Sequence, residues 1–382
     1  MQKFEKHSPV VVTEVTTKHE LRQFMQYPNR LYADNPNYIP SFYGDDLSDW
    51  TPGKNPAFDY CEARCWLAWR DGEIVGRIGA ILSHKANDKF GTHRMRFSQV
   101  DFVDDSEVSA ALFGTVERWA RQKGCDQVHG PLGFTDMDRE GMLVEGFDRR
   151  SLFITNYNAP YYPEHLTRLG YRKDVDWIEY RISVPAPGSA EAERLHKLSE
   201  FILKRKHLHV ATLHHKSEYG PFVRQVFELV NAAYAPLYGV VELSDEQIER
   251  YANKFIPLVD PDFVCFVLDE QDKLVAFGVT TLDPSPALKH SDGRLFPFGW
   301  AEVLNDLHHG DTLIMLLTAV RPDLQTEGIN AVMMDHVCQS CNRHGVQFAE
   351  TGPMLELNDH ILAQWKRLEK EQHKRRRCFI KD

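Results

Sequence analysis

The chain has 382 residues, of which 42% are hydrophobic and 26% are charged. This composition is typical of a folded protein and excludes an intrinsically disordered chain, and the length suits roughly two to three domains. Lysine and arginine number 45 against 55 aspartates and glutamates, which gives a net charge of −10. An acidic total disfavours nucleic acid and anionic membranes, so neither is an expected partner.

The sequence lacks the motifs and patterns that are typical of several classes of function. We find no signal-peptide pattern, and no apolar run approaches the roughly 20 residues that span a bilayer. Seven cysteines fit reduced thiols and a cytoplasmic location better than a disulfide scaffold. Cys338 and Cys341 form a CxxC within a predicted helix and read as ordinary helix residues, so no metal site is expected. The motifs GxxxxGKS/T, GxGxxG, GxSxG and HExxH are absent.

Residues 185–189, which are rich in proline and glycine, divide the chain near its middle. The following segment, 190–206, has leucine and isoleucine at helical spacing and predicts a helix. We therefore expect an N-terminal domain over 1–187, a linker helix over 188–207 and a C-terminal domain over 208–382.

Both halves show the same order of predicted elements. In the first half we expect strands over 72–82, 95–103, 126–130 and 178–184, with a helix over 106–123. In the second half we expect strands over 272–282, 312–320, 346–351 and 376–381, with a helix over 328–344. Each helix stops at a glycine, Gly124 or Gly345. This order predicts mixed α/β domains and suggests a duplication, with a chance repeat as the alternative.

The most informative segment is the strand over 312–320 with the loop and helix that follow it. Pro322 ends the strand because it has no N–H group, and the loop leaves unpaired N–H groups at a helix start, which favour a phosphate. The segment resembles the cofactor-binding motif of the GCN5-related N-acetyltransferase (GNAT) superfamily, Q/R-x-x-G-x-G/A. Gln325 and Gly328 match that motif, and Asn330 stands at its last marked position.

A second segment, 355–368, looks like the late motif of the same superfamily, N-x-x-A-x-x-L-Y-x-x-L. Asn358 matches its first position and Trp365 occupies the usual tyrosine position. The resemblance covers the second half well and the first half loosely, and the whole chain looks like a group of bacterial tandem-GNAT proteins. It implies an α/β (α+β mixed sheet) class with two tandem GNAT-like acyl-CoA acyltransferase domains. It also implies acetyl-CoA or another acyl-CoA as co-substrate and direct transfer to an amine of a small-molecule or peptide acceptor.

The resemblance also implies roles for particular residues. The cofactor would contact Ala319, Val320, Gln325, Thr326, Glu327, Gly328, Ile329, Asn330, Asn358 and Trp365. Glu350 and Glu356 are candidates for the base that removes a proton from the acceptor. Trp365 cannot replace the family's tyrosine as an acid, because an indole N–H does not ionise usefully, so the proton donor is not identified. Glu327 brings a negative charge into a phosphate loop, and its side chain is expected to point away.

The equivalent loop of the first half, 103–108, has no glycine, and its Asp and Ser residues are good helix caps. We therefore expect that the first half does not bind coenzyme A. Its aromatic segment offers acceptor-site candidates, with ordinary packing as the alternative: Tyr157, Asn158, Tyr161 and Tyr162. The loop 293–299 is either a lid or an ordinary loop.

The basic run 366–377 is expected to be the solvated end of a helix that leads into the last strand. A contact with a cofactor phosphate and a nucleic-acid site are its alternatives. For the chain as a whole, the alternative function is a non-catalytic acyl-CoA-binding or assembly protein that retains the fold.

Overall fold

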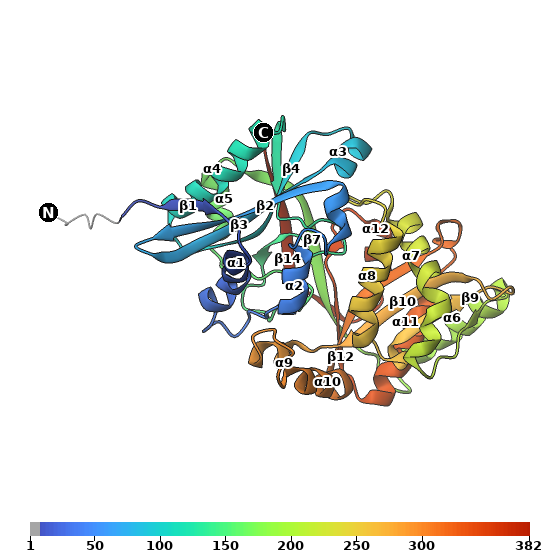
Figure 1. Ribbon diagram of the computed structural model, residues 1–382. Helices are drawn as coiled ribbons and strands as arrows, with labels where there is room; N and C mark the ends of the chain where they lie inside the picture. The colour runs from blue at the N-terminus through green and yellow to red at the C-terminus, as the bar shows by residue number, and fades with distance from the viewer. Residues whose placement is uncertain (1–7) are drawn as a thin grey trace. The chain divides into compact units, whose positions relative to one another are not determined.

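The computed structural model describes residues 8–382 and divides the chain into two compact units (Figure 1). The first unit contains the chain up to Asp176 together with Arg376–Asp382, and the second unit is Trp177–Arg375. Strands β7 (Arg172–Ser183) and β14 (Lys370–Lys381) each belong partly to both units. The end of the chain is thus part of the first unit, which the order of the sequence did not indicate.

The first unit has its strands in the order β1-β2-β3-β4-β5, and β5 pairs with the end of β14. Strands β4 and β5 are parallel and their neighbours are antiparallel. Its elements are β1 (Val11–Glu14), α1 (Lys18–Leu31), α2 (Tyr43–Asp49), η1 (Pro56–Asp59), β2 (Cys61–Arg70), β3 (Glu73–Ser83), α3 (His84–Phe90), β4 (Arg94–Phe102), α4 (Ser106–Gln122), β5 (Gln127–Gly130), β6 (Met142–Glu145) and α5 (Tyr162–Arg168).

The second unit has its strands in the order β7-β12-β11-β10-β9-β8, with β11 and β12 parallel. Its elements, apart from β7 and β14, are α6 (Ala190–Lys206), β8 (His209–Val210), η2 (Lys216–Tyr219), α7 (Gly220–Tyr234), α8 (Asp245–Phe255), η3 (Ile256–Leu258), η4 (Pro261–Phe263), β9 (Val264–Leu268), β10 (Leu274–Leu282), α9 (Ser285–His290), α10 (Gly299–His309), β11 (Thr312–Val320), η5 (Pro322–Leu324), α11 (Asn330–His344), β12 (Phe348–Thr351), β13 (Met354–Leu355) and α12 (Asp359–Ala363). The predicted mixed α/β class and the repeated strand–helix–strand order are confirmed.

Local chemistry explains why the main helices begin and end where they do. The Ser189 side chain accepts a hydrogen bond from the N–H of Ala192 at 3.2 Å and so caps α6, whose bounds are those predicted. Helix α11 ends at Gly345, which adopts the left-handed conformation with φ +72°. Glycine takes that conformation without a steric cost, so it is a good helix stop.

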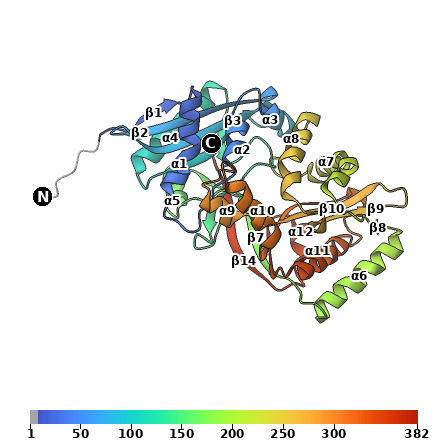
Figure 2. The same ribbon diagram turned by 60° about the horizontal axis from the view of Figure 1, so that its bottom comes forward.

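Each unit has an apolar core between its sheet and one long helix. In the first unit, Leu112, Phe113 and Val116 of α4 are fully buried and belong to one cluster with Phe97 of β4. Burial of each such side chain stabilises the fold by about 1.5–3 kcal/mol. In the second unit, α11 and the earlier helix α6 lie side by side (Figures 1 and 2). Ile202 of α6 is buried in one cluster with Val320 of β11 and with Ile329 at the start of α11.

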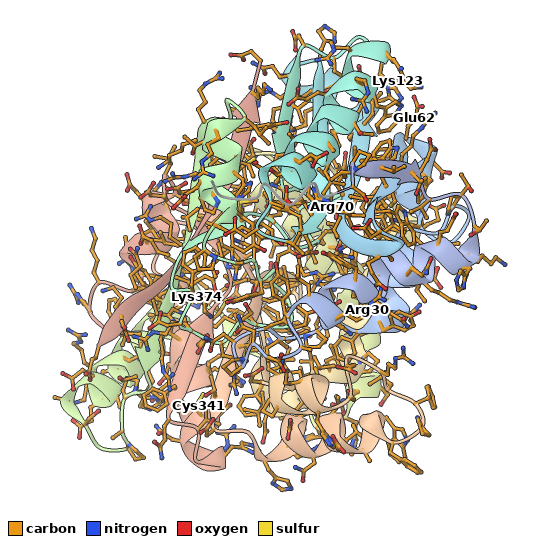
Figure 3. The ribbon with its side chains drawn as sticks, turned by 90° about the vertical axis from the view of Figure 1, so that its left-hand side faces the viewer. Arg30, Glu62, Arg70, Lys123, Cys341 and Lys374 are labelled. Atoms are coloured by element: carbon orange, nitrogen blue, oxygen red, sulfur yellow. The ribbon has the colours of Figure 1, made fainter. Side chains whose placement is uncertain are left out.

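The basic run near the C-terminus is a correction to the sequence analysis. Helix α12 ends at Ala363, and the run from Lys370 onward is strand β14, not the end of a helix. Lys374, which is labelled in Figure 3, has a fully buried side chain between Glu179 and Glu350. The predicted solvated face is therefore wrong for much of this run. Within residues 8–382, no helix combines the length and apolar character needed to cross a membrane.

Candidate functional site

Strands β11 and β12 pair over only the first part of β11. Their register runs from Thr312 opposite Phe348 to Met315 opposite Thr351, where β12 ends, whereas β11 continues to Val320. Residues 312–314 and 319–320 of β11 are buried, and residues 315–318 are half-buried. The two strands therefore part at Met315, and the edge of β11 opens there.

A bulge lies at the same point on the other side of β11. Leu317 pairs with Val279 of β10 and Met315 pairs with Thr280, so Leu316 is left out of the ladder. A bulge redirects the side chains and backbone groups next to it and is frequent beside binding sites. The bulge therefore makes strand β11 irregular at the point where it separates from β12.

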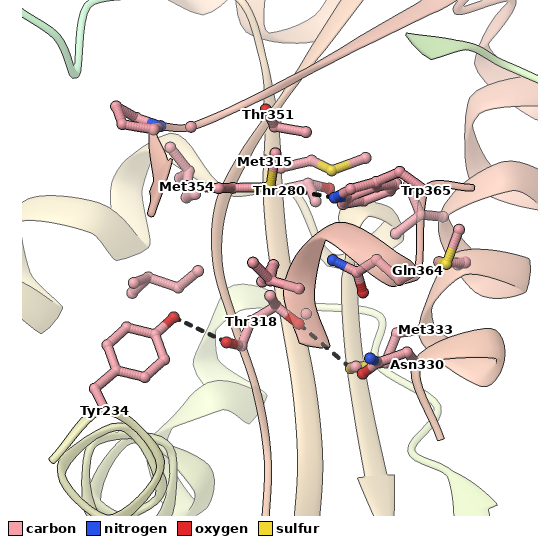
Figure 4. Close-up of a pocket in the computed structure, with 18 residues that line it drawn as sticks. Tyr234, Thr280, Met315, Thr318, Asn330, Met333, Thr351, Met354, Gln364 and Trp365 are labelled. Atoms are coloured by element: carbon pink, nitrogen blue, oxygen red, sulfur yellow. Dashed lines mark hydrogen bonds between the residues drawn. The ribbon is translucent and has the colours of Figure 1, made fainter. Parts of the chain in front are cut away.

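A cavity of about 140 Å³ occupies the opening (Figure 4). Its wall is mostly apolar and includes Met315, Met333, Met334 and Met354, whose unbranched side chains adapt to ligands of different shape. The remaining lining residues are Tyr234, Gly278, Thr280, Leu316, Leu317, Thr318, Asn330, Val337, Thr351, Gly352, Pro353, Ile361, Gln364 and Trp365. A cavity with this lining suits an aliphatic group.

Tyr234 places a hydroxyl group in this cavity. It stands at the end of α7, and its hydroxyl donates a hydrogen bond of 2.8 Å to the carbonyl oxygen of Thr318 on β11 (Figure 4). The Thr318 hydroxyl in turn contacts the sulfur of Met333 at 3.8 Å. The sequence analysis did not find Tyr234, because no motif marks it and it lies far from β11 along the chain.

The loop between β11 and α11 has the geometry of an anion site. Gly328 has φ +80°, and a Cβ atom on it would lie 3.2 Å from Cδ1 of Ile202. Among residues 8–382, no acceptor is found for the backbone N–H groups of Thr326, Gly328 and Ile329. Ile329 is the N-cap residue of α11 and supplies no side-chain cap. The helix start therefore leaves its amide dipoles for a ligand.

Both acidic side chains of the loop are held by basic partners. Glu327 forms an ion pair of 2.5 Å with Lys206 of α6, and Asp323 forms one of 2.7 Å with Arg321. The hydrogen bond from Lys206 and the charge of the same ammonium group lower the pKa of Glu327. Both carboxylates are therefore engaged by basic side chains.

The other predicted cofactor residues take different places. Asn330 and Trp365 line the cavity, and Trp365 is buried with its indole N–H on the sulfur of Met354 at 3.1 Å. The Gln325 side chain donates to the carbonyl oxygen of Val320 at 3.3 Å. Three further residues do not contribute to the lining: Ala319 and Val320 are buried at the end of β11, and Asn358 caps α12.

The two candidate bases lie outside the cavity wall. Glu350 alternates with Thr351 on β12, and Thr351 lines the cavity whereas Glu350 contacts Lys374 at 3.2 Å. Glu356 forms an ion pair with Arg375. Both carboxylates are thus engaged by basic side chains of β14. The loop 293–299, with Phe296 and Phe298 exposed, contributes no lining residue either.

The first unit has the same opening between parallel strands, but its own side chains fill it. Strands β4 and β5 pair up to Arg96 opposite His129, and β4 then continues to Phe102. The N–H of Phe102 donates to the Tyr162 hydroxyl at 2.7 Å, and the ring of Tyr162 stacks on that of Phe102 at 4.1 Å. The hydroxyl of Tyr161 donates to the carbonyl oxygen of Phe102.

The first backbone amides of helix α4, which follows this opening, are also already bonded. The Asp105 carboxylate accepts hydrogen bonds from the N–H groups of Glu107 and Val108 and forms an ion pair with Arg70, which is labelled in Figure 3. An anion at the start of α4 would therefore meet a carboxylate in place of free amides. That the first unit does not bind coenzyme A stays a prediction.

A second cavity, of about 500 Å³, lies in the first unit. Two of the acceptor-site candidates, Tyr157 and Tyr161, line it beside Asn35 and Asp34. The other two lie elsewhere: Asn158 is buried with its amide on the backbone of Leu143, and Tyr162 fills the opening of β4.

One group of metal-ligand residue types also lies in the first unit. Single ligand atoms of His129, Asp174 and Cys378 lie within 4.8 Å of one another. The guanidinium of Arg94 is 3.7 Å from the Asp174 carboxylate, so this carboxylate already has a positively charged partner. Burial, together with the charges of Arg96 and Arg94, lowers the pKa of His129.

Comparisons with known proteins agree with this architecture. No family model matches the sequence. The chain is 27% identical over 381 residues to "Protein YghO" of Escherichia coli K12, covering 97% of this chain and 95% of that protein. It is 28% identical over 299 residues to the bacterial ceramide synthase of Caulobacter vibrioides, covering 77% of this chain and 75% of that protein.

The fold is also found among solved structures. A tandem GNAT protein from the clavulanic acid biosynthesis pathway, solved without AcCoA, superposes with a TM-score of 0.55 at 13% sequence identity. The match covers 97% of this chain and 98% of that protein. The chain therefore has the tandem GNAT fold, as the sequence motifs indicated.

Proposed function

We propose that the chain is an acyl-CoA-dependent N-acyltransferase whose reaction takes place in the second unit. The observation that carries the proposal is the opening of β11 from β12 at Met315, with an apolar cavity beside it and a loop of free amides at the start of α11. A thioester bound along this edge has its acyl group in the cavity and its phosphates at the loop. The tandem GNAT fold supports this arrangement.

The proposed chemistry is direct acyl transfer. The amine nitrogen of the acceptor attacks the thioester carbonyl carbon, a C–N bond forms and the C–S bond breaks. In this proposal, the backbone edge of β11 around Leu316, where the ladder with β10 is interrupted, stabilises the oxyanion that develops. The amine loses one proton to a base, for which Glu350 and Glu356 are the candidates through water. The coenzyme A thiolate accepts one proton.

Tyr234 is the residue that we propose as the proton donor to that thiolate. Its hydroxyl group lies in the cavity wall and donates a hydrogen bond of 2.8 Å to the Thr318 carbonyl oxygen, so it holds an O–H proton beside the opening. Trp365 occupies the position of the family's tyrosine but offers no such proton. Tyr234 would thus replace it from the other side of the opening.

The acceptor and the acyl group are each proposed from one observation. One relative, 28% identical, is named a bacterial ceramide synthase, and a ceramide is the N-acyl derivative of a long-chain amino alcohol. The cavity of this chain is apolar and rich in methionine, which suits an aliphatic acyl group. We propose a long-chain amino alcohol as the acceptor.

Transfer assays with the purified chain test this function. Acyl-CoA homologues of increasing chain length are mixed with a long-chain amino alcohol or with a polar amine, and the released thiol and the amide product are measured. Transfer to the amino alcohol is expected. Leu316→Trp, which fills the cavity, should abolish transfer, whereas Leu304→Trp on the exposed face of α10 should not. Acyl-CoA binding without transfer to any amine would instead support the non-catalytic alternative.

A further inference from the structure

The loop proposed to hold the phosphates has a cluster of basic residues beside it. The last turn of α6 carries Lys204, Arg205 and Lys206, close to the negative end of the helix dipole. The ammonium group of Lys206 reaches the loop itself, 2.5 Å from the carboxylate of Glu327. Helix α6 runs beside α11 in both views of the chain (Figures 1 and 2).

Apolar packing holds this end of α6 in place. Ile202 is buried in one cluster with Ile329 and Val332 of the α11 start. Its Cδ1 atom lies against Gly328, at 3.2 Å from the position that a Cβ atom would take. Because the helix end is fixed against the loop, its basic side chains need little ordering when a ligand binds, which lowers the entropic cost of the contact.

The charge balance of the chain makes such a contact valuable. A ligand with several phosphate charges meets a protein of net charge −10. Two basic residues of the C-terminal run are already paired, Lys374 with Glu350 and Arg377 with Asp176. The end of α6 is the basic cluster that reaches the loop. Lys206 is about one-quarter exposed, and its ion-pair partner is Glu327.

We propose that the basic end of α6 is a phosphate subsite. Lys206, with Arg205 beside it, exchanges its carboxylate partner Glu327 for a phosphate group of the bound acyl-CoA. The Glu327 carboxylate then competes with the phosphate for the Lys206 ammonium group, and in the free protein it holds that ammonium group beside the loop. This inference rests on the proposed function, because it deepens the cofactor site of that function.

Calorimetry on the full chain tests the subsite with coenzyme A as the probe. Lys206→Ala should weaken binding about tenfold, the scale of one charge-assisted hydrogen bond. Glu327→Gln should tighten it, because it removes the competitor and one repulsive charge. Lys197→Ala is the matched control, since Lys197 lies on the same helix, is exposed and pairs with Glu193. Binding by this control should equal that of the wild type.

The double variant Lys206→Ala/Glu327→Gln separates a phosphate contact from simple neutralisation of Glu327. If Lys206 contacts phosphate, the double variant binds about tenfold more weakly than Glu327→Gln alone. Equal binding by these two variants would overturn the subsite. Dephospho-coenzyme A locates the contact: an effect that persists assigns it to the pyrophosphate, and an effect that disappears assigns it to the 3′-phosphate.

The two proposals fail in different ways. Wild-type chain that binds no coenzyme A would remove the proposed function and the subsite with it. Wild-type chain that binds coenzyme A, with unchanged binding by Lys206→Ala, would remove the subsite alone.

Discussion

Tyr162→Phe tests the conclusion that the first unit fills its own opening. The Tyr162 hydroxyl accepts the N–H of Phe102 at 2.7 Å and bonds to the hydroxyl of Tyr32 at 2.6 Å, and all three residues are buried. The variant keeps the stacked ring but leaves the Phe102 N–H without an acceptor. An unsatisfied buried donor costs about 1–3 kcal/mol, so the free energy of unfolding of this unit should fall by about 2 kcal/mol.

Tyr161→Phe is the matched control for this prediction. Its hydroxyl donates to the carbonyl oxygen of Phe102, which also accepts the Tyr162 O–H at 3.1 Å, so no buried group is left without a partner. Urea unfolding should therefore show a loss below about 1 kcal/mol for the control, the ordinary net value of one hydrogen bond. Coenzyme A binding should be unchanged in both variants. A loss for Tyr162→Phe no larger than for Tyr161→Phe would refute the reasoning.

Three further predictions concern the second unit. Tyr234→Phe should slow transfer at saturating substrate by about 10²-fold or more, because it removes the proposed proton donor. Loss of the hydrogen bond to Thr318 alone would cost about 1 kcal/mol, or roughly fivefold. Steady-state kinetics distinguishes these two values. Gly328→Ala forces a side chain to φ +80°, at a cost of about 1–2 kcal/mol, so urea unfolding should show the free energy of unfolding lowered by this amount. Asp335 raises the pKa of His196 above 6.5, so their ion pair stabilises the protein fully below pH 6.5 and the effect is lost as pH rises through the raised pKa. Urea unfolding from about pH 6 to 9 should show a larger loss for the wild type than for His196→Asn.

The sequence predicted those elements that local chemistry decides. The helices α6 and α11 begin and end close to the predicted residues, because the cap at Ser189 and the stop at Gly345 are local signals. Strand β11 has the predicted bounds, because a short continuous apolar run that ends just before Pro322 is typical of a buried strand. The repeated order of elements, read from the same signals, was enough to predict the fold class.

Features that depend on distant partners could not be predicted in this way. Lys374 and Arg376 are in a strand with little apolar pattern. They can be buried because Glu350 accepts a hydrogen bond from Lys374 and the carbonyl oxygen of Asn156 accepts one from Arg376. Tyr162 fills the opening of β4 from a helix about sixty residues further along the chain. Pairings of this kind have no periodic signature, so only the folded chain brings them together.

The number of coenzyme A molecules that bind each chain tests the central claim most directly. Titration of acetyl-CoA into the full chain by calorimetry should give one site per chain. The second unit has a cavity at its strand opening and free loop amides, whereas in the first unit Tyr162 fills the opening and Asp105 caps the helix start. The same titration with Leu316→Trp should weaken or abolish this binding. Two sites per chain, or none, would contradict the account.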